Sequence, residues 1–338
     1  MTVRARASGQ GETSGAGPVD GGHGEVDAAT RAHFTARAVQ YSGGSEGSLQ
    51  AILELAAPRP GERVLDVATG TGLVLFALAA RVGAERFGVG RADEGRSGGL
   101  AVGVDFTAAM LAEAARRRAG VTGTTEGEAP GMTQRAAGSA GAATPGAAQG
   151  GTGSLGGAAA GTSPGANGTA EGAVLIAAHA TQLPFRSASF DVVTCRFAVH
   201  HFADPSASLA AMAGALRPGG RLVIADFVCP VDREAAARQD RLERLRGHVY
   251  VEIFTQPRLQ EMLATVGCPV TAVRSSPREL RQQEWLGSPN LPAESRASLA
   301  EMIDDLTAHG GAGLEVRQVD GESRFLRQDA VLLGVKSG

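Results

Sequence analysis

A short apolar run that passes through a glycine-rich turn into a helix is the feature that most constrains the fold of this chain. Residues 63–82 read RVLDVATGTGLVLFALAARV, in which 63–68 predicts a buried strand and 71–82 a helix. Glycine in the turn allows a tight reversal of the backbone and a close approach to a bound molecule. The segment therefore predicts a strand–turn–helix unit that holds a small molecule at its turn.

The same alternation continues along the chain. Strands are predicted at 100–105, 172–178, 190–197 and 221–228, and helices at 107–119 and 205–216, with Arg-Pro-Gly-Gly at 217–220 as a helix stop. Later segments predict helices at 231–250 and 255–268 and strands at 270–275 and 330–337. Almost continuously apolar strands are typical of a parallel sheet with helices on both faces. We therefore predict the α/β class, with a doubly wound, Rossmann-like, mostly parallel sheet.

Three stretches lack the pattern of a core. Residues 1–25 are small, polar and glycine-rich, 84–99 carry charge and glycine without a period, and 120–172 hold almost no large apolar side chain. Such stretches cannot offset the entropy lost on ordering. We predict a disordered N-terminus over 1–25 and one domain over 26–338 with low-complexity insertions at 84–99 and 120–172. Accessory segments at 231–250 and 276–328 are expected to form a helical cap.

Composition and charge exclude several classes of protein. The net charge of −3 argues against a protein that neutralises the phosphates of a nucleic acid. No apolar run is long enough to cross a membrane, and the N-terminus does not read as a secretory signal. Cys195, Cys229 and Cys268 are far apart, without zinc-type spacing. We expect a cytoplasmic protein with no metal site and no nucleic-acid partner, whose oligomeric state the sequence leaves open.

The glycine turn is compatible with two cofactor classes, dinucleotides and S-adenosylmethionine. A dinucleotide fingerprint needs GxGxxG after the strand, but Leu75 stands at the third glycine position. Asp66 precedes the turn, where it would repel a pyrophosphate and tolerate a ligand with ammonium and sulfonium cations. Asp105 ends the next strand, where an acid can hold ribose hydroxyls once the insertion at 84–99 is set aside. These residues favour S-adenosylmethionine and disfavour a nicotinamide-dependent oxidoreductase.

Four stretches carry a resemblance to a known family. LDVATGTG, GVDFTAAML, LPFRSASFDVVTCRFAVHHF and LRPGGRLVIADF resemble the successive motifs of class I S-adenosylmethionine-dependent methyltransferases. The resemblance covers roughly 30–118 and 172–275, and points to the broad ubiquinone/menaquinone-biosynthesis-like branch that acts on small molecules. The turn at 198–201 reads AVHH where quinone methyltransferases of that branch tend to have Gly-Leu-Arg-Asn, so quinone biosynthesis is not implied. The stretch after the fourth strand also lacks the Pro-Pro-Tyr turn of enzymes that methylate amino groups of nucleic-acid bases.

The resemblance implies roles for individual residues. The methionine part of the cofactor would be lined by Asp66, Ala68, Gly70 and Gly72. Tyr41, in a segment that resembles the N-terminal lid of the family, would either cover the methionine part or pack against the domain. The ribose and adenine would be held by Asp105, Phe106, Met110, His179 and Ala180. His179 stands where the family usually has an acid that accepts the adenine amine, and a neutral imidazole is a weaker acceptor. The alternative is that His179 points to solvent.

The acceptor end of the site is predicted from the residues after the fourth strand. Methyl transfer from a sulfonium needs an aligned nucleophile and often the removal of a proton. His200 and His201 are the candidate bases, with steric positioning as the alternative. A cap holding Trp285, Leu286, Phe254 and Tyr250 would suit a phenolic or enolic oxygen, or an activated ring carbon, of a small molecule in secondary metabolism. A non-catalytic S-adenosylmethionine-binding protein of the same fold is the second hypothesis.

Overall fold

The computed structural model describes residues 23–39, 46–84, 98–120, 172–282, 286, 291, 293–308 and 315–338. Tyr41, Trp285 and most of the stretches 1–25, 84–99 and 120–172 lie outside the described residues. Helix α1 begins at His23, three residues before the expected domain boundary at 26.

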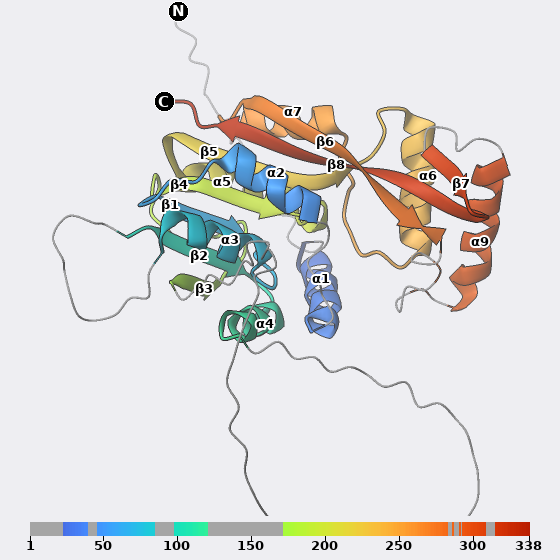
Figure 1. Cartoon of the computed structure of the whole chain (residues 1–338), viewed down its shortest axis with the longest axis horizontal. Helices are drawn as coiled ribbons and strands as arrows, with labels where there is room; N and C mark the ends of the chain where they lie inside the picture. The colour runs from blue at the N-terminus through green and yellow to red at the C-terminus, as the bar shows by residue number, and fades with distance from the viewer. Residues whose placement is uncertain are drawn as a thin grey trace, which may run out of the picture.

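An eight-stranded mixed sheet forms the centre of the molecule, with strand order β3-β2-β1-β4-β5-β8-β6 and β7 paired to β8. Strands β1 to β5 are parallel, and β8 pairs antiparallel with β5, β6 and β7. The strands are β1 (Arg63–Val67), β2 (Leu100–Asp105), β3 (Ala173–Ala177), β4 (Phe190–Arg196), β5 (Leu216–Val228), β6 (Val270–Arg281), β7 (Glu315–Val319) and β8 (Glu322–Val335). The predicted α/β class with a doubly wound, mostly parallel sheet is confirmed (Figure 1).

Helices cover both faces of this sheet because successive strand side chains point to opposite sides. Val192 packs in one apolar cluster with α2 and α3, and its neighbour Val193 packs in a second cluster with α5 and α7. The helices are α1 (His23–Arg37), α2 (Glu46–Ala56), α3 (Leu73–Val82), α4 (Ala108–Arg118), α5 (Pro205–Ala215), α6 (Arg233–Leu245), α7 (Gln256–Thr265) and α9 (Ala293–Ala308), with the short 3₁₀ turn η1 (Val199–His201). None of the helices among the described residues has the length and apolar character that a membrane span requires.

The ends of the helices follow from local sequence chemistry. Helix α5 begins with Asp204, whose carboxylate accepts the backbone N–H of Ala207 over 2.8 Å, and Pro205 fills the first turn. Helix α3 ends at Gly83, which adopts φ 68°. These signals explain why the predicted bounds of β1 to β4 and α3 to α5 agree with the structure to within two residues.

The structure corrects the prediction in two places. Residues 217–220 were expected only to stop α5, but they lie within β5, where Gly219 at φ 74° and a register shift opposite Phe190 and Val192 mark an irregularity. The segment 276–328 was expected to be irregular to helical. Its described part instead contains the end of β6, all of β7 and the start of β8 in addition to α9.

These late strands form a long ribbon that extends past the parallel sheet (Figure 1). Helices α6 and α9 pack on its far end and share a separate apolar cluster with it, which includes Leu242, Leu280, Leu299 and Phe325. The ribbon therefore carries its own small core, apart from the two clusters that sandwich the sheet.

Candidate active site

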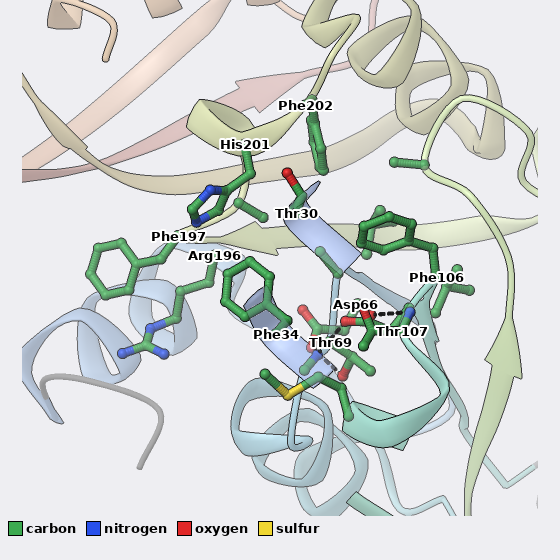
Figure 2. Close-up of a pocket in the computed structure, with 18 of the residues that line it drawn as sticks. Thr30, Phe34, Asp66, Thr69, Phe106, Thr107, Arg196, Phe197, His201 and Phe202 are labelled. Atoms are coloured by element: carbon green, nitrogen blue, oxygen red, sulfur yellow. Dashed lines mark hydrogen bonds between the residues drawn. The ribbon is translucent and has the colours of Figure 1, made fainter. Parts of the chain in front are cut away.

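A pocket opens at the carboxyl ends of β1, β2 and β4, where the strand order reverses. Its volume is about 890 Å³, including the open solvent at its mouth. The lining comes from α1, from the turns after β1 and β2, and from the residues that follow β3 and β4; it comprises Asp27, Thr30, Phe34, 66–71, Leu73, Val74, 104–107, Met110, 178–180, 196–198, His201 and Phe202. Ligands of open α/β sheets bind at such a reversal. The described part of the chain thus brings most of the predicted site residues together (Figure 2).

The turn after β1 is held in a conformation that favours glycine. Gly70 and Gly72 adopt φ 55° and 86°, and Ala68 adopts φ 55° although it carries a side chain. Gly72 is not a lining residue. It caps α3, and a Cβ atom there would come within 2.5 Å of Cε2 of Phe76. Gly72 therefore shapes the turn, and it does not line the pocket as the resemblance implied.

Asp66 lies beneath this turn, with a side chain that is almost fully buried. Its carboxylate accepts the hydroxyls of Thr69 over 2.7 Å and Thr194 over 2.6 Å. Burial raises the pKa of Asp66 to about 6, although the two threonine hydrogen bonds and Arg196 act in the opposite direction. A partly desolvated carboxylate at the pocket wall favours a ligand that brings its own positive charge.

Asp105 ties the end of β2 to the turn after β1. Its carboxylate accepts the backbone N–H of Gly70 over 2.9 Å and that of Thr107 over 2.8 Å. Burial raises the pKa of Asp105 above its usual range, and the hydrogen bonds from Thr107 and Gly70 oppose that shift. Each carboxylate oxygen retains a further lone pair, so Asp105 can still accept hydroxyls from a ligand.

His179 is held by two partners at the other end of the pocket. Its Nδ1 atom lies 2.8 Å from Oγ1 of Thr181 and accepts the backbone N–H of Thr181 over 3.3 Å, and its Nε2 atom lies 3.1 Å from the carboxylate of Asp27 in α1. Phe106 meets the His179 ring edge to face, with centroids 5.8 Å apart, and Arg31 lies over the Phe106 ring at 5.0 Å. Asp27 was not predicted as a site residue, because nothing in the polar sequence of α1 indicates which of its acids faces the sheet.

The two candidate bases occupy different places. His201 lines the pocket, and its ring meets Phe34 of α1 edge to face with centroids 4.9 Å apart (Figure 2). His200 is buried behind it, with Nδ1 at 2.6 Å from the carboxylate of Asp226. Burial, followed by repulsion from His200 and His248, holds the pKa of His201 well below its usual value. Of the two, His201 is the one that a bound acceptor can reach.

Aromatic rings surround this end of the pocket. Phe34, Phe197 and Phe202 line it together with His201. Phe197 adopts φ 49°, an uncommon conformation for a bulky residue, directly after β4. Figure 2 shows Phe34 and His201 facing each other on one side and Phe106 on the opposite side. The sequence analysis did not single out Phe34, Phe197 or Phe202.

The expected aromatic cap does not form from its described members. Phe254 packs in the main apolar cluster, and the Tyr250 hydroxyl donates to the backbone carbonyl and carboxylate of Asp240. Leu286 packs against the cluster of α6, α9 and the ribbon. None of these three lines the described pocket wall, which α1 covers instead. The apolar pattern of these segments was interpreted as a surface for the acceptor, but the side chains of Phe254 and Leu286 pack within the fold.

Comparison with known proteins agrees with this architecture. The chain matches the family model described as a methyltransferase domain over residues 40–273. It is 28% identical over 115 residues to the uncharacterized methyltransferase YcgJ of Bacillus subtilis, covering 34% of this chain and 46% of the relative. It is 29% identical over 181 residues to a demethylmenaquinone methyltransferase of Beutenbergia cavernae, covering 54% of this chain and 47% of the relative. The chain therefore spans about half the length of these curated relatives.

A solved structure extends the likeness to the fold of the described domain. The crystal structure of Bacillus subtilis YcgJ superimposes with a TM-score of 0.63 at 19% identity, and the match covers 87% of this chain and 100% of that one. At this identity the likeness concerns the fold and not the substrate.

Proposed function

This chain belongs to the methyltransferase-domain family, and we propose that it transfers the methyl group of S-adenosylmethionine to a small-molecule acceptor. The observation that carries the proposal is the pairing of two buried acids around one glycine turn. Asp66 lies under the turn and Asp105 accepts the N–H of Gly70, so the turn is flanked by carboxylates on both sides. A pyrophosphate would be repelled there, whereas a ligand with an ammonium, a sulfonium and a ribose diol suits both acids.

The methionine part of the donor is placed at Asp66, Ala68 and Gly70. Ala68 and Gly70 adopt positive φ, and among the described residues, apart from the two neighbours of Gly70 in the chain, no atom lies within 4 Å of where a Cβ of Gly70 would be. The backbone is therefore open to a ligand at this position. The ribose is placed at Asp105, whose two oxygens are already oriented by backbone N–H groups. Preorganised acceptors of this kind lose little entropy when a diol binds.

The adenine is placed between Phe106, Met110 and the pair formed by His179 and Asp27. Because Nδ1 of His179 accepts the N–H of Thr181, the ring proton is at Nε2 and is donated to Asp27. Because Asp27 lines the pocket, its second carboxylate oxygen is our candidate acceptor for the adenine amine. We propose that Asp27 supplies, from α1, the acidic group that the resemblance places at position 179.

The acceptor is placed among Phe34, Phe197, Phe202 and His201. This wall suits a flat, mostly apolar molecule whose nucleophile is a phenolic or enolic oxygen or an activated ring carbon. His201 positions that nucleophile or takes its proton while the methyl passes in line from sulfur to the acceptor. The face that α1 covers keeps water away from the transferring methyl group.

Calorimetric titration of the full chain with S-adenosylmethionine, S-adenosylhomocysteine and NAD tests the donor. We expect both sulfur ligands to bind and NAD not to bind. Transfer of a labelled methyl group to a panel of phenols and enols then tests the reaction. Tight NAD binding without binding of the sulfur ligands would overturn the proposal. Cofactor binding without transfer to any acceptor would instead support the non-catalytic alternative.

A further inference from the structure

Three histidines from distant parts of the chain meet behind the acceptor end of the pocket. We propose that His200, His201 and His248 form a binding site for a divalent transition-metal ion of the zinc type. His200 and His201 belong to η1, and His248 follows α6. One ring nitrogen from each residue lies within 4.8 Å of the nitrogens offered by the other two. The site goes beyond the methyl transfer proposed above, and binding at it can be measured without any methyl donor.

The spacing of the three rings is close to what coordination needs. Ring centroids are 3.9 Å apart for His200 and His201, 5.4 Å for His200 and His248, and 5.5 Å for His201 and His248. Zinc binds imidazole nitrogen at roughly 2.0–2.1 Å, which in a tetrahedral site separates the nitrogens by about 3.3 Å. Binding of an ion would therefore require the nitrogens to approach one another from separations of up to 4.8 Å.

Two of the histidines already have the outer partners that metal ligands use. Nδ1 of His200 lies 2.6 Å from a carboxylate oxygen of Asp226, and Nδ1 of His248 lies 2.9 Å from a carboxylate oxygen of Glu243. A carboxylate that accepts the Nδ1 proton places the lone pair on Nε2 and fixes the ring orientation. Asp226 and Glu243 are themselves almost fully buried. The negative charge of Asp226 lies where it can offset the charge of a cation, whereas Glu243 is already paired with Arg246 and orients His248 through its hydrogen bond.

The third histidine, His201, has a buried ring nitrogen that lacks a hydrogen-bond partner among the described residues. His201 is 7% exposed, and its Nδ1 makes no hydrogen bond to any residue that the structure describes. A buried polar atom left without a partner destabilises the folded chain, so such atoms call for an explanation. Coordination of a metal ion by Nδ1 explains it. The neighbouring Phe227 ring has no N–H or O–H group, and the hydroxyl of Tyr250 donates to Asp240.

Three neutral imidazoles with outer carboxylates suit zinc, cobalt, nickel or copper better than magnesium or calcium. Three protein ligands also leave a fourth position for another molecule. Because His201 lines the pocket, that position is expected to face the acceptor. An ion there would supply Lewis-acid chemistry to an acceptor oxygen, and this consequence, unlike the binding itself, rests on the proposed function. A histidine that holds the ion cannot also serve as the base.

The test is metal binding by the full chain, purified without a polyhistidine tag and stripped with a chelator. Co²⁺ is titrated while visible absorption is recorded, and Zn²⁺ is titrated by calorimetry. We expect one equivalent of each ion, visible bands typical of a four-coordinate Co²⁺ site, and displacement of Co²⁺ by Zn²⁺. His248→Gln should weaken Zn²⁺ binding by at least 100-fold, and Asp226→Asn by roughly 10- to 100-fold, as outer partners generally do. His33→Gln is the matched control, because His33 lies on α1 outside the cluster, and should bind as the wild type does.

Circular dichroism of the metal-free proteins checks that each variant folds. Zn²⁺ should raise the thermal unfolding midpoint of the wild type and of His33→Gln but not that of His248→Gln, which gives a second readout of the same site. The proposal is overturned if the stripped wild type shows no saturable binding, or if it binds no more tightly than a folded His248→Gln variant. The cluster would then be a neutral packing arrangement of three rings.

Discussion

The backbone N–H of Gly70 donates to the carboxylate of Asp105 over 2.9 Å, so the turn after β1 is bonded to the end of the neighbouring strand β2. One side chain thereby fixes the shape of the turn and presents its remaining lone pairs to the pocket. Binding of a ribose and rigidity of the turn depend on the same carboxylate.

Replacing this carboxylate should weaken donor binding. In Asp105→Asn one oxygen becomes an N–H₂ group, which cannot accept the backbone N–H that it faces. We expect S-adenosylhomocysteine affinity to fall by roughly 10- to 100-fold, as measured by calorimetry, because hydrogen bonds to charged groups contribute about 1.5–3 kcal/mol. Asp191→Asn is the control, since Asp191 is a buried acid at the start of β4 that accepts the N–H of Arg63. Equal loss of affinity in both variants would contradict a specific role for Asp105.

The glycine at the start of α3 should not tolerate a side chain. In Gly72→Ala the new Cβ meets Phe76 at 2.5 Å, and the residue must also hold φ 86°. We expect the free energy of unfolding in urea to fall by about 2–4 kcal/mol, combining backbone strain and a clash in a packed interior. Gly219→Ala separates the two effects, because Gly219 has φ 74° and a Cβ there would meet no described residue within 4 Å other than its neighbours in the chain. It should lose only about 1–2 kcal/mol, the strain of the left-handed conformation. If Gly219→Ala lowers the free energy of unfolding as much as Gly72→Ala does, the clash with Phe76 contributes nothing to the loss of stability.

Stability should depend on the titration of Asp66. Burial raises its pKa from 3.8 to about 6 in the folded chain, so the folded state binds the proton more tightly than the unfolded state. Asp66 therefore adds stability below about pH 4, and this contribution is lost as the pH rises through about 6. In urea titrations from pH 4 to pH 7, the wild type should lose up to about 3 kcal/mol relative to Asp66→Asn. A pH-independent difference between the two proteins would show that Asp66 does not titrate in this range.

Asp27 should make the protein prefer a cofactor that carries adenine over one that carries another base. The proposed acceptor for the adenine amine is lost when Asp27 becomes an amide that turns its N–H₂ group to the pocket. We expect Asp27→Asn to bind S-adenosylhomocysteine about 3- to 10-fold more weakly, and to lose preference over the inosine analogue, in which an oxygen replaces the amine. Glu25→Gln, a change to an exposed acid of the same helix, should keep both the affinity and the preference. If Asp27→Asn keeps the wild-type preference, the amine has another acceptor.

The parallel half of the fold could be predicted from the sequence because its signals are local. Apolar strands, the glycine turn and the proline at the start of α5 each determine the conformation of the residues around them. Asp66 and Asp105 could be placed for the same reason, since Asp66 is the penultimate residue of β1 and Asp105 is the last residue of β2.

The remaining features depend on contacts between distant segments. Asp27 and Phe34 reach the pocket only because α1 packs across its mouth, and His248 reaches His200 and His201 only through the path of the chain after α6. The ribbon of β6, β7 and β8 was partly missed because its outer strand residues are largely polar and exposed, which removes the apolar pattern that marks a buried strand. Such placements require the tertiary structure.

The two low-complexity stretches of the sequence, 84–99 and 120–172, end where strands begin, since β2 starts at Leu100 and β3 starts at Ala173. Strand beginnings lie at the edge of a parallel sheet opposite the pocket. The pocket and the two points where low-complexity sequence joins a strand therefore lie at opposite edges of one sheet. We expect that lineages of this domain can gain or lose sequence at these two joints without altering the pocket, and that an engineer can use the same joints to attach a reporter.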